Sequence, residues 1–259
     1  MDSIILRYYK YHRGSRDNML DELIFLFNEN YPERFIDEVK GFFHNFEWPD
    51  ICLSEKIVKG FLEPFPEEMQ EINNEINDFN GLRPFQIEYL GTYKSKDLVT
   101  LYINSIEKTA GRYHAIVGSA QYQKRDIIRF LTDIIIVHEF VHWIVDILLK
   151  KRGRQGFKYT TQDEVFFHEG LAQYFTYHMI KYDKNVASVF SWLLPFQLKR
   201  YKVFQELITP GYNLNDVMVG IWLCVNSKKQ SWTELKFYID EASKIKGDSG
   251  HKISTILHR

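Results

Sequence analysis

Residues 131–149 read LTDIIIVHEFVHWIVDILL and form the most apolar run of the chain. The apolar side chains recur at helical spacing, which predicts a helix that is buried over most of its surface. Charged residues interrupt the run, among them Asp133, Glu139 and Asp146. A charged side chain at the centre of a bilayer costs about 3 kcal/mol, so we expect a core helix and no membrane span.

The centre of this run, His138-Glu139-Phe140-Val141-His142, carries the first chemical signal. Two histidines four positions apart lie on one face of a helix, one turn apart. Their imidazoles can therefore share one zinc ion, with Glu139 beside an open coordination position. Burying these groups without a partner would be unfavourable, and a metal ion supplies that partner. Two ordinary core histidines with hydrogen bonds are the alternative interpretation.

A third ligand is expected, because catalytic zinc uses three protein ligands and leaves the fourth position for water. Glu169 follows His142 by 27 positions, which leaves room for a loop to reverse and a second helix to return. Thr161 and Glu164 predict the start of that helix, because a threonine three residues before a glutamate can form a capping box. We expect the second helix to span about 161–181.

Gly170 stands inside this second helix, where glycine is less favourable than alanine by about 1 kcal/mol. Close packing is the natural reason, and we expect Gly170 and Ala172 to let the second helix approach the first. A solvated position is the alternative interpretation for Glu169. Its apolar and aromatic neighbours argue against full solvation: Phe166, Phe167, Leu171, Tyr174 and Phe175.

The segment from His138 to His142, followed by Glu169-Gly170-Leu171-Ala172, resembles the gluzincin metallopeptidases, the group that contains thermolysin and the aminopeptidase-N type enzymes. The resemblance covers about residues 126–180. It implies one Zn²⁺ ion per chain, bound by His138, His142 and Glu169. It also implies that Glu139 is the general base that activates a water for peptide hydrolysis.

The resemblance extends to two further positions that support the ligands. Asp146 matches an aspartate of thermolysin-like helices, and Gln173 stands where relatives often have an acidic residue. Both are candidates to orient a ligand imidazole, with ordinary helix polarity as the alternative.

The family also uses a transition-state hydrogen-bond donor, for which Tyr174, Tyr212 and His168 are the candidates. His168 directly precedes Glu169, and adjacent helix positions point about 100° apart, so we expect His168 to face away from the metal. No segment like the Gly-Ala-Met-Glu-Asn motif of aminopeptidase-N relatives precedes the zinc helix. An endopeptidase is therefore favoured over an aminopeptidase.

The segment before the zinc helix predicts a small sheet. Three short runs are rich in β-branched and aromatic residues and read as strands: Phe85–Tyr89, Val99–Ile103 and Tyr113–Gly118. The resemblance implies that this sheet lies beside the zinc helix, at about 126–151, and one exposed edge could pair with an extended substrate. The expected fold is α+β and zincin-like, mostly helical with a small sheet.

We divide the chain into three regions on these patterns. A mostly helical N-terminal region spans 1–80, a zincin-like catalytic core spans 81–184, and a helical C-terminal region spans 185–259. The core holds the sheet and both helices that carry zinc ligands.

Composition narrows the expected partners and location. The formal net charge is −1, so no general attraction to nucleic acid or to an anionic membrane is expected. Basic residues in 150–158 are interpreted as a solvated loop, with nucleic-acid association as a minor alternative. Cys52 and Cys224 have no metal-ligand spacing and favour a reducing compartment. The first residues do not form a signal peptide, so a cytoplasmic location is expected.

The sequence therefore predicts a zinc-dependent metallopeptidase that acts on a peptide or protein substrate. The alternative is a non-catalytic zinc-fold protein that uses the same cleft to bind a peptide or protein partner. The presence of Glu139 together with all three ligands favours the enzyme.

Overall fold

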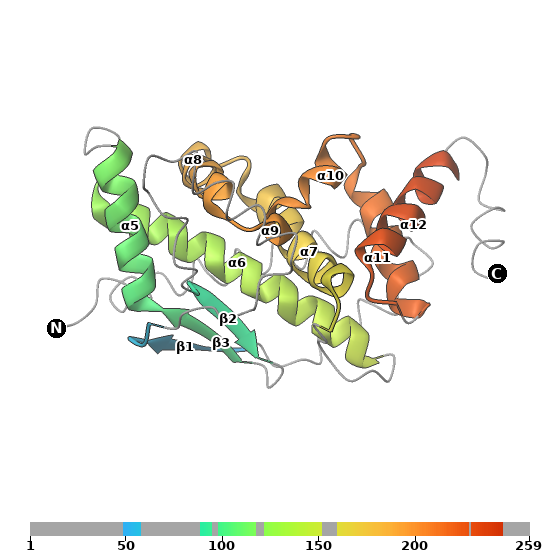
Figure 1. Cartoon of the computed structure of the whole chain (residues 1–259), viewed down its shortest axis with the longest axis horizontal. Helices are drawn as coiled ribbons and strands as arrows, with labels where there is room; N and C mark the ends of the chain where they lie inside the picture. Colours follow the sequence, from blue (N-terminus) through green and yellow to red (C-terminus); the bar gives the residue numbers. More distant parts are fainter. Residues whose placement is uncertain are drawn as a thin grey trace.

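The computed structural model describes residues 49–57, 89–94, 98–117, 122–151, 160–227 and 229–245. Helix α6 (Lys124–Lys151) crosses the molecule between the sheet on one side and α7 (Gln162–Ile180) and α8 (Lys184–Leu193) on the other (Figure 1). It contacts β2, β3, α5, α7 and α8. The helix predicted at about 126–151 is confirmed and begins two residues before the expected start.

The described sheet has three strands in the order β1-β3-β2. Strand β3 (Leu98–Tyr102) pairs parallel with β1 (Asp50–Ser54) and antiparallel with β2 (Gly91–Lys94). The strand predicted at Val99–Ile103 is confirmed as β3, whereas β1 was not predicted. The run Phe85–Tyr89 lies outside the described residues, apart from its last position.

The strand predicted at Tyr113–Gly118 is wrong. Most of it belongs to α5 (Ile103–Val117), which follows β3 directly. A repeat of buried residues at helical spacing explains the difference, because one face of α5 packs against α6. That face comprises Ile103, Ile106, Thr109, Ala110 and Tyr113. The repeat of buried residues along α5 therefore outweighs the local strand preference of the β-branched residues near its end.

Helix α7 begins as predicted. Thr161 is its N-cap, the Thr161 hydroxyl accepts the backbone N–H of Glu164 at 3.2 Å, and the Glu164 carboxylate accepts the N–H of Thr161 at 3.0 Å. This capping box satisfies two backbone donors at the helix start. Glu169 and its neighbours are thereby held in a regular helix whose direction is set by the first turn.

The remainder of the described chain is helical, as expected for the C-terminal region. It continues through η1 (Leu194–Phe196), α9 (Lys199–Lys202), α10 (Gln205–Ile208), α11 (Leu214–Asn226) and α12 (Trp232–Ile245). Helix α7 contacts α9 and α12, and α11 packs along α12. Among the described helices, none combines the length and the apolar composition that a bilayer crossing requires.

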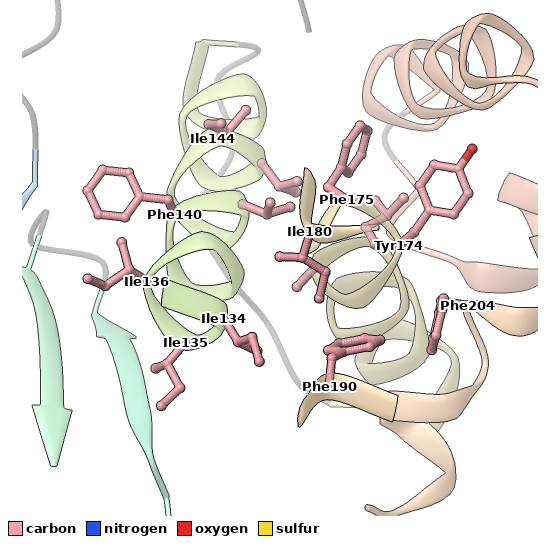
Figure 2. Packing of buried hydrophobic residues seen from close by; sticks show 14 of the residues in the cluster. Ile134, Ile135, Ile136, Phe140, Ile144, Tyr174, Phe175, Ile180, Phe190 and Phe204 are labelled. Carbon is pink, nitrogen blue, oxygen red and sulfur yellow. The ribbon is translucent and has the colours of Figure 1, made fainter. Parts of the chain in front are cut away.

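The hydrophobic core surrounds α6. Figure 2 shows Ile136 and Phe140 on the side of α6 that faces the strands, and Ile180 of α7 between the two helices. All three side chains are buried. The observed fold is therefore mostly helical with a small mixed sheet packed against α6, which confirms the predicted α+β class. The helices predicted within residues 1–80 lie outside the described residues.

Candidate metal centre

Helices α6 and α7 bring three metal-ligating side chains together. The Nε2 atoms of His138 and His142 are 3.1 Å apart. The Oε2 atom of Glu169 lies 3.1 Å from the first and 3.5 Å from the second. In the described part of the chain, these side chains form the one cluster of three that could share a metal ion.

The geometry and the donor set fit a zinc ion. Zinc binds imidazole nitrogen and carboxylate oxygen at about 2.0–2.2 Å, which places tetrahedral ligand atoms about 3.3 Å apart. The measured separations lie on either side of this value. The three side chains are nearly buried, with exposed fractions of 12%, 7% and 9% for His138, His142 and Glu169. Three converging lone pairs in a site with so little water are stabilised by a shared cation.

The charges of Glu169 and His142 shift each other's pKa values. Burial alone would raise the pKa of Glu169, but His142 and His138 hold it well below its ordinary value. Burial alone would lower the pKa of His142, and the Glu169 carboxylate raises it instead. The Glu169 carboxylate is therefore ionised at neutral pH, as metal coordination requires.

Glu139 lies against strand β2, beside the triad. Its Cγ and Oε1 atoms are each 3.2 Å from the position that a Cβ at Gly91 would occupy, and the same Cβ would overlap the side chain of Ile135. Glycine therefore lets β2 pass close to α6 at this point. The backbone N–H of Tyr93, two residues along the strand, donates a hydrogen bond to the Glu139 carboxylate.

The environment of Glu139 favours proton uptake. Burial raises its pKa, and the opposing effects of His138, His142 and the Tyr93 N–H are smaller. The residue is 7% exposed. A buried carboxyl with a raised pKa, beside a group of metal ligands, is suited to accepting and returning a proton.

A cleft opens on this site, and His138 and Glu139 lie in its wall. Tyr89 and Tyr201 line the same cleft, and the ring centroid of Tyr201 is 6.1 Å from that of His138. Burial raises the pKa of both tyrosines, and the negative charge of Glu169 acts in the same direction. Both hydroxyl groups therefore keep their protons at neutral pH and can donate hydrogen bonds into the cleft.

Sequence reasoning did not single out Tyr201 or Tyr89. Tyr201 lies in the short helix α9, and the chain reaches it only after passing through α8 and η1. Its proximity to the triad depends on the packing of α9 against α7. No local pattern marks this tyrosine among the 16 in the chain.

The two residues expected to orient an imidazole each make a hydrogen bond to another element of the fold. Asp146 is fully buried, and its Oδ2 atom accepts the hydroxyl of Tyr93 at 2.7 Å. Gln173 donates its Nε2 hydrogen to Gln197 Oε1 at 3.1 Å. Asp146 therefore connects α6 to β2, and Gln173 connects α7 to the segment after η1.

The structure places the three sequence-predicted donors outside the cleft lining. Tyr174 is buried on the side of α7 away from α6 (Figure 2). Tyr212 donates its hydroxyl to Asp240 of α12, and this hydrogen bond raises its pKa to about 12. The Nε2 atom of His168 lies 2.5 Å from Gln230 Oε1, which directs the ring toward the start of α12.

Gly170 does not serve the contact that the sequence suggested. A Cβ at this position would lie 2.6 Å and 2.9 Å from ring atoms of Trp232 and 2.9 Å from Val203 Cγ2. The close approach is therefore toward the start of α12 and the end of α9, and the expected approach to α6 is wrong for Gly170. Adjacent positions on a helix face different directions, so Glu169 faces α6 while Gly170 faces Trp232.

Comparisons with protein-family models, with curated proteins and with solved structures return no match for this chain.

Proposed function

We propose that this protein is a zinc-dependent metallopeptidase that cleaves peptide bonds within a chain. One observation carries the proposal: a buried carboxyl group, Glu139, lies beside the His138–His142–Glu169 triad and lines the same cleft. A purely structural metal site would have no need of a buried carboxyl group beside its ligands. The strand next to Glu139 supports the same function.

Strand β2 can hold an extended peptide. The backbone N–H of Tyr102 donates to the carbonyl of Leu90 at 2.9 Å. Leu90 therefore belongs to a hydrogen-bonded pair, and in an antiparallel ladder such pairs alternate with pairs that exchange no hydrogen bonds. The residues at the next odd positions, Gly91 and Tyr93, therefore direct their backbone groups away from β3. Among the described strands β2 lies at an edge of the sheet. A peptide that pairs with this edge would pass Glu139.

The chemistry follows from the groups in the cleft. When bound, a zinc ion acts as a Lewis acid and lowers the pKa of a water toward neutrality. Glu139 takes a proton from the attacking water and returns it to the leaving amine. Tyr201, with Tyr89 as the second candidate, donates a hydrogen bond to the carbonyl oxygen as negative charge develops on it.

The proposed specificity for internal bonds rests on the sequence. A motif that would hold a free amino terminus, like that of aminopeptidase-N relatives, is not found before the zinc helix. We therefore expect cleavage of peptides whose two ends are blocked by acetylation and amidation.

The test uses zinc-free, zinc-loaded and Glu139→Gln protein with a library of blocked peptides, read by mass spectrometry. We expect cleavage only by the zinc-loaded wild type. The Glu139→Gln variant should retain zinc and lose at least about a hundredfold in rate, the low end of general-base contributions. Glu234→Gln, on the far helix α12, serves as the matched control and should keep its rate.

Two outcomes would contradict the proposal. Undiminished cleavage by Glu139→Gln would place the activity elsewhere. Peptide binding without any cleavage by the zinc-loaded wild type would instead favour a non-catalytic zinc protein that uses the cleft for a partner.

A further inference from the structure

The cleft beside the triad is a cavity of about 160 Å³. Ile134 and Ile135 of α6 lie in its wall, one helical turn before His138 and Glu139. Gln173 of α7 also lines it, one turn beyond Glu169. This part of the cavity wall therefore lies about one helical turn, or about 5.4 Å along the helix, from His138 and Glu139, which line the same cavity.

The size and most of the wall suit one apolar group. An apolar cavity of about 150 Å³ in another protein binds a benzene molecule, so this volume accommodates one six-membered ring. The apolar lining comes from α6, α8, η1 and the segment before β2: Leu90, Ile134, Ile135, Leu193, Phe196 and Leu198.

A buried amide pair makes part of the same wall polar. Gln173 is 3% exposed and donates its Nε2 hydrogen to Gln197 Oε1, and both residues line the cavity. No described residue donates a hydrogen bond to Gln173 Oε1. A buried amide oxygen without a donor is destabilising, and an incoming ligand with a hydroxyl group would relieve it.

We infer that this cavity is a side-chain subsite selective for tyrosine beside the cleaved bond. This inference rests on the proposed peptidase function, because the subsite lies beside a cleaved bond only if the protein cleaves peptides. The tyrosine ring fills the apolar part, and its hydroxyl group donates to Gln173 Oε1. A hydroxyl group both donates and accepts hydrogen bonds, so it pairs with the amide in either orientation of the amide plane.

Other side chains fit less well. Phenylalanine fills the same volume but leaves the amide of Gln173 without its donor. Lysine would bring an ammonium group to a neutral amide and an apolar wall. Arg112 also lines the cavity, so selection of an acidic side chain is the competing outcome that the experiment must separate.

The experiment uses blocked heptapeptides of alanine with one central variable residue: tyrosine, phenylalanine, leucine or glutamate. Rates are measured as kcat/KM on the zinc-loaded full chain, and mass spectrometry locates the cut. Binding of the same peptides to the Glu139→Gln protein is measured by calorimetry. We expect a fivefold to tenfold preference for tyrosine over phenylalanine in both measurements, as roughly one additional hydrogen bond provides.

Gln173→Met tests the amide, because methionine has a similar shape and makes no comparable hydrogen bond. In this variant the ratio of tyrosine to phenylalanine should fall to about one or below. Gln205→Met, at the start of α10 and outside the cavity lining, is the matched control and should leave the ratio unchanged. Retained zinc in both variants shows that the triad is intact.

The outcomes separate the subsite from the peptidase function. Equal binding and equal cleavage of the tyrosine and phenylalanine peptides would overturn the subsite, as would a tyrosine preference that survives Gln173→Met. A preference for the glutamate peptide would also overturn the tyrosine subsite, because it would show that Arg112 selects an acidic side chain. Selective binding of the tyrosine peptide without cleavage would support the subsite and contradict the peptidase.

Discussion

The two sides of helix α7 differ in what they do, although the residues concerned are neighbours in sequence. Glu169 faces α6 and is surrounded by two imidazoles that hold its pKa well below its ordinary value. His168 faces the start of α12, where burial lowers its pKa to about 3 although the hydrogen bond that its ring makes to Gln230 Oε1 opposes this. One side is therefore stabilised by charge between three ionisable groups, and the other by packing and hydrogen bonds.

The side toward α12 holds the ligand-bearing helix in position. Asp163, in the first turn of α7, accepts hydrogen bonds from Ser231 and from the backbone and hydroxyl of Thr233. Trp232 fills the space that a side chain at Gly170 would need. We therefore expect metal affinity to depend on one face of α7 and fold stability on the other.

The largest effect is expected on zinc affinity, when Glu169 and its neighbour His168 are changed separately. Glu169→Ala should lower zinc affinity by more than about a hundredfold, because it removes one of three protein ligands. His168→Gln should keep about one zinc per chain and lose about 1–3 kcal/mol of unfolding free energy, since its buried hydrogen bond is disturbed. Metal analysis, chelator competition and denaturant titration measure both. A His168→Gln protein without zinc would break the division between the two faces.

A smaller effect is expected at Gly170. Gly170→Ala should destabilise the fold by about 1–3 kcal/mol through overpacking against the Trp232 ring, which outweighs the gain of about 1 kcal/mol in helix propensity. Urea unfolding measures the change. In a double-mutant cycle, Trp232→Leu should remove most of the cost of the alanine. A stabilised Gly170→Ala protein would show that the ring can move aside.

The smallest effect is expected at the start of α7. Thr161→Ala should cost about 1 kcal/mol of unfolding free energy, because it removes half of the capping box. Thr161→Ser keeps a hydroxyl group at the N-cap and should recover most of the loss. Thermal unfolding compares the three proteins, and zinc content should stay the same in all of them. Zinc loss in Thr161→Ala would mean that the first turn governs the ligand face as well.

Features that depend on short segments were predictable from the sequence. The histidine pair four positions apart, the capping box at Thr161 and the long apolar run each follow from helix geometry within a few residues. For this reason α6, α7 and the three ligands could be proposed together. The third ligand needed only the assumption that the two helices return past one another.

Features that depend on distant packing were not predictable. Strand β1 pairs with β3 across 48 positions, and no local signal in Asp50–Ser54 marks that partner. Tyr113 belongs to a helix because α5 packs against α6, which outweighs local β-propensity. Tyr201 reaches the cleft only through the path of α8, η1 and α9. The direction of Gly170 likewise required knowing where Trp232 lies.

The shortness of strand β2 has a consequence for association between molecules. An unpaired strand edge can template pairing with another copy of the chain, and long, flat edges are those that lead to aggregation. Strand β2 has four residues, and within it only Gly91 and Tyr93 direct backbone groups outward. The N–H of Tyr93 is already engaged by Glu139. Over these four residues the edge is therefore short, which suits pairing with a short peptide better than with a long strand of another copy.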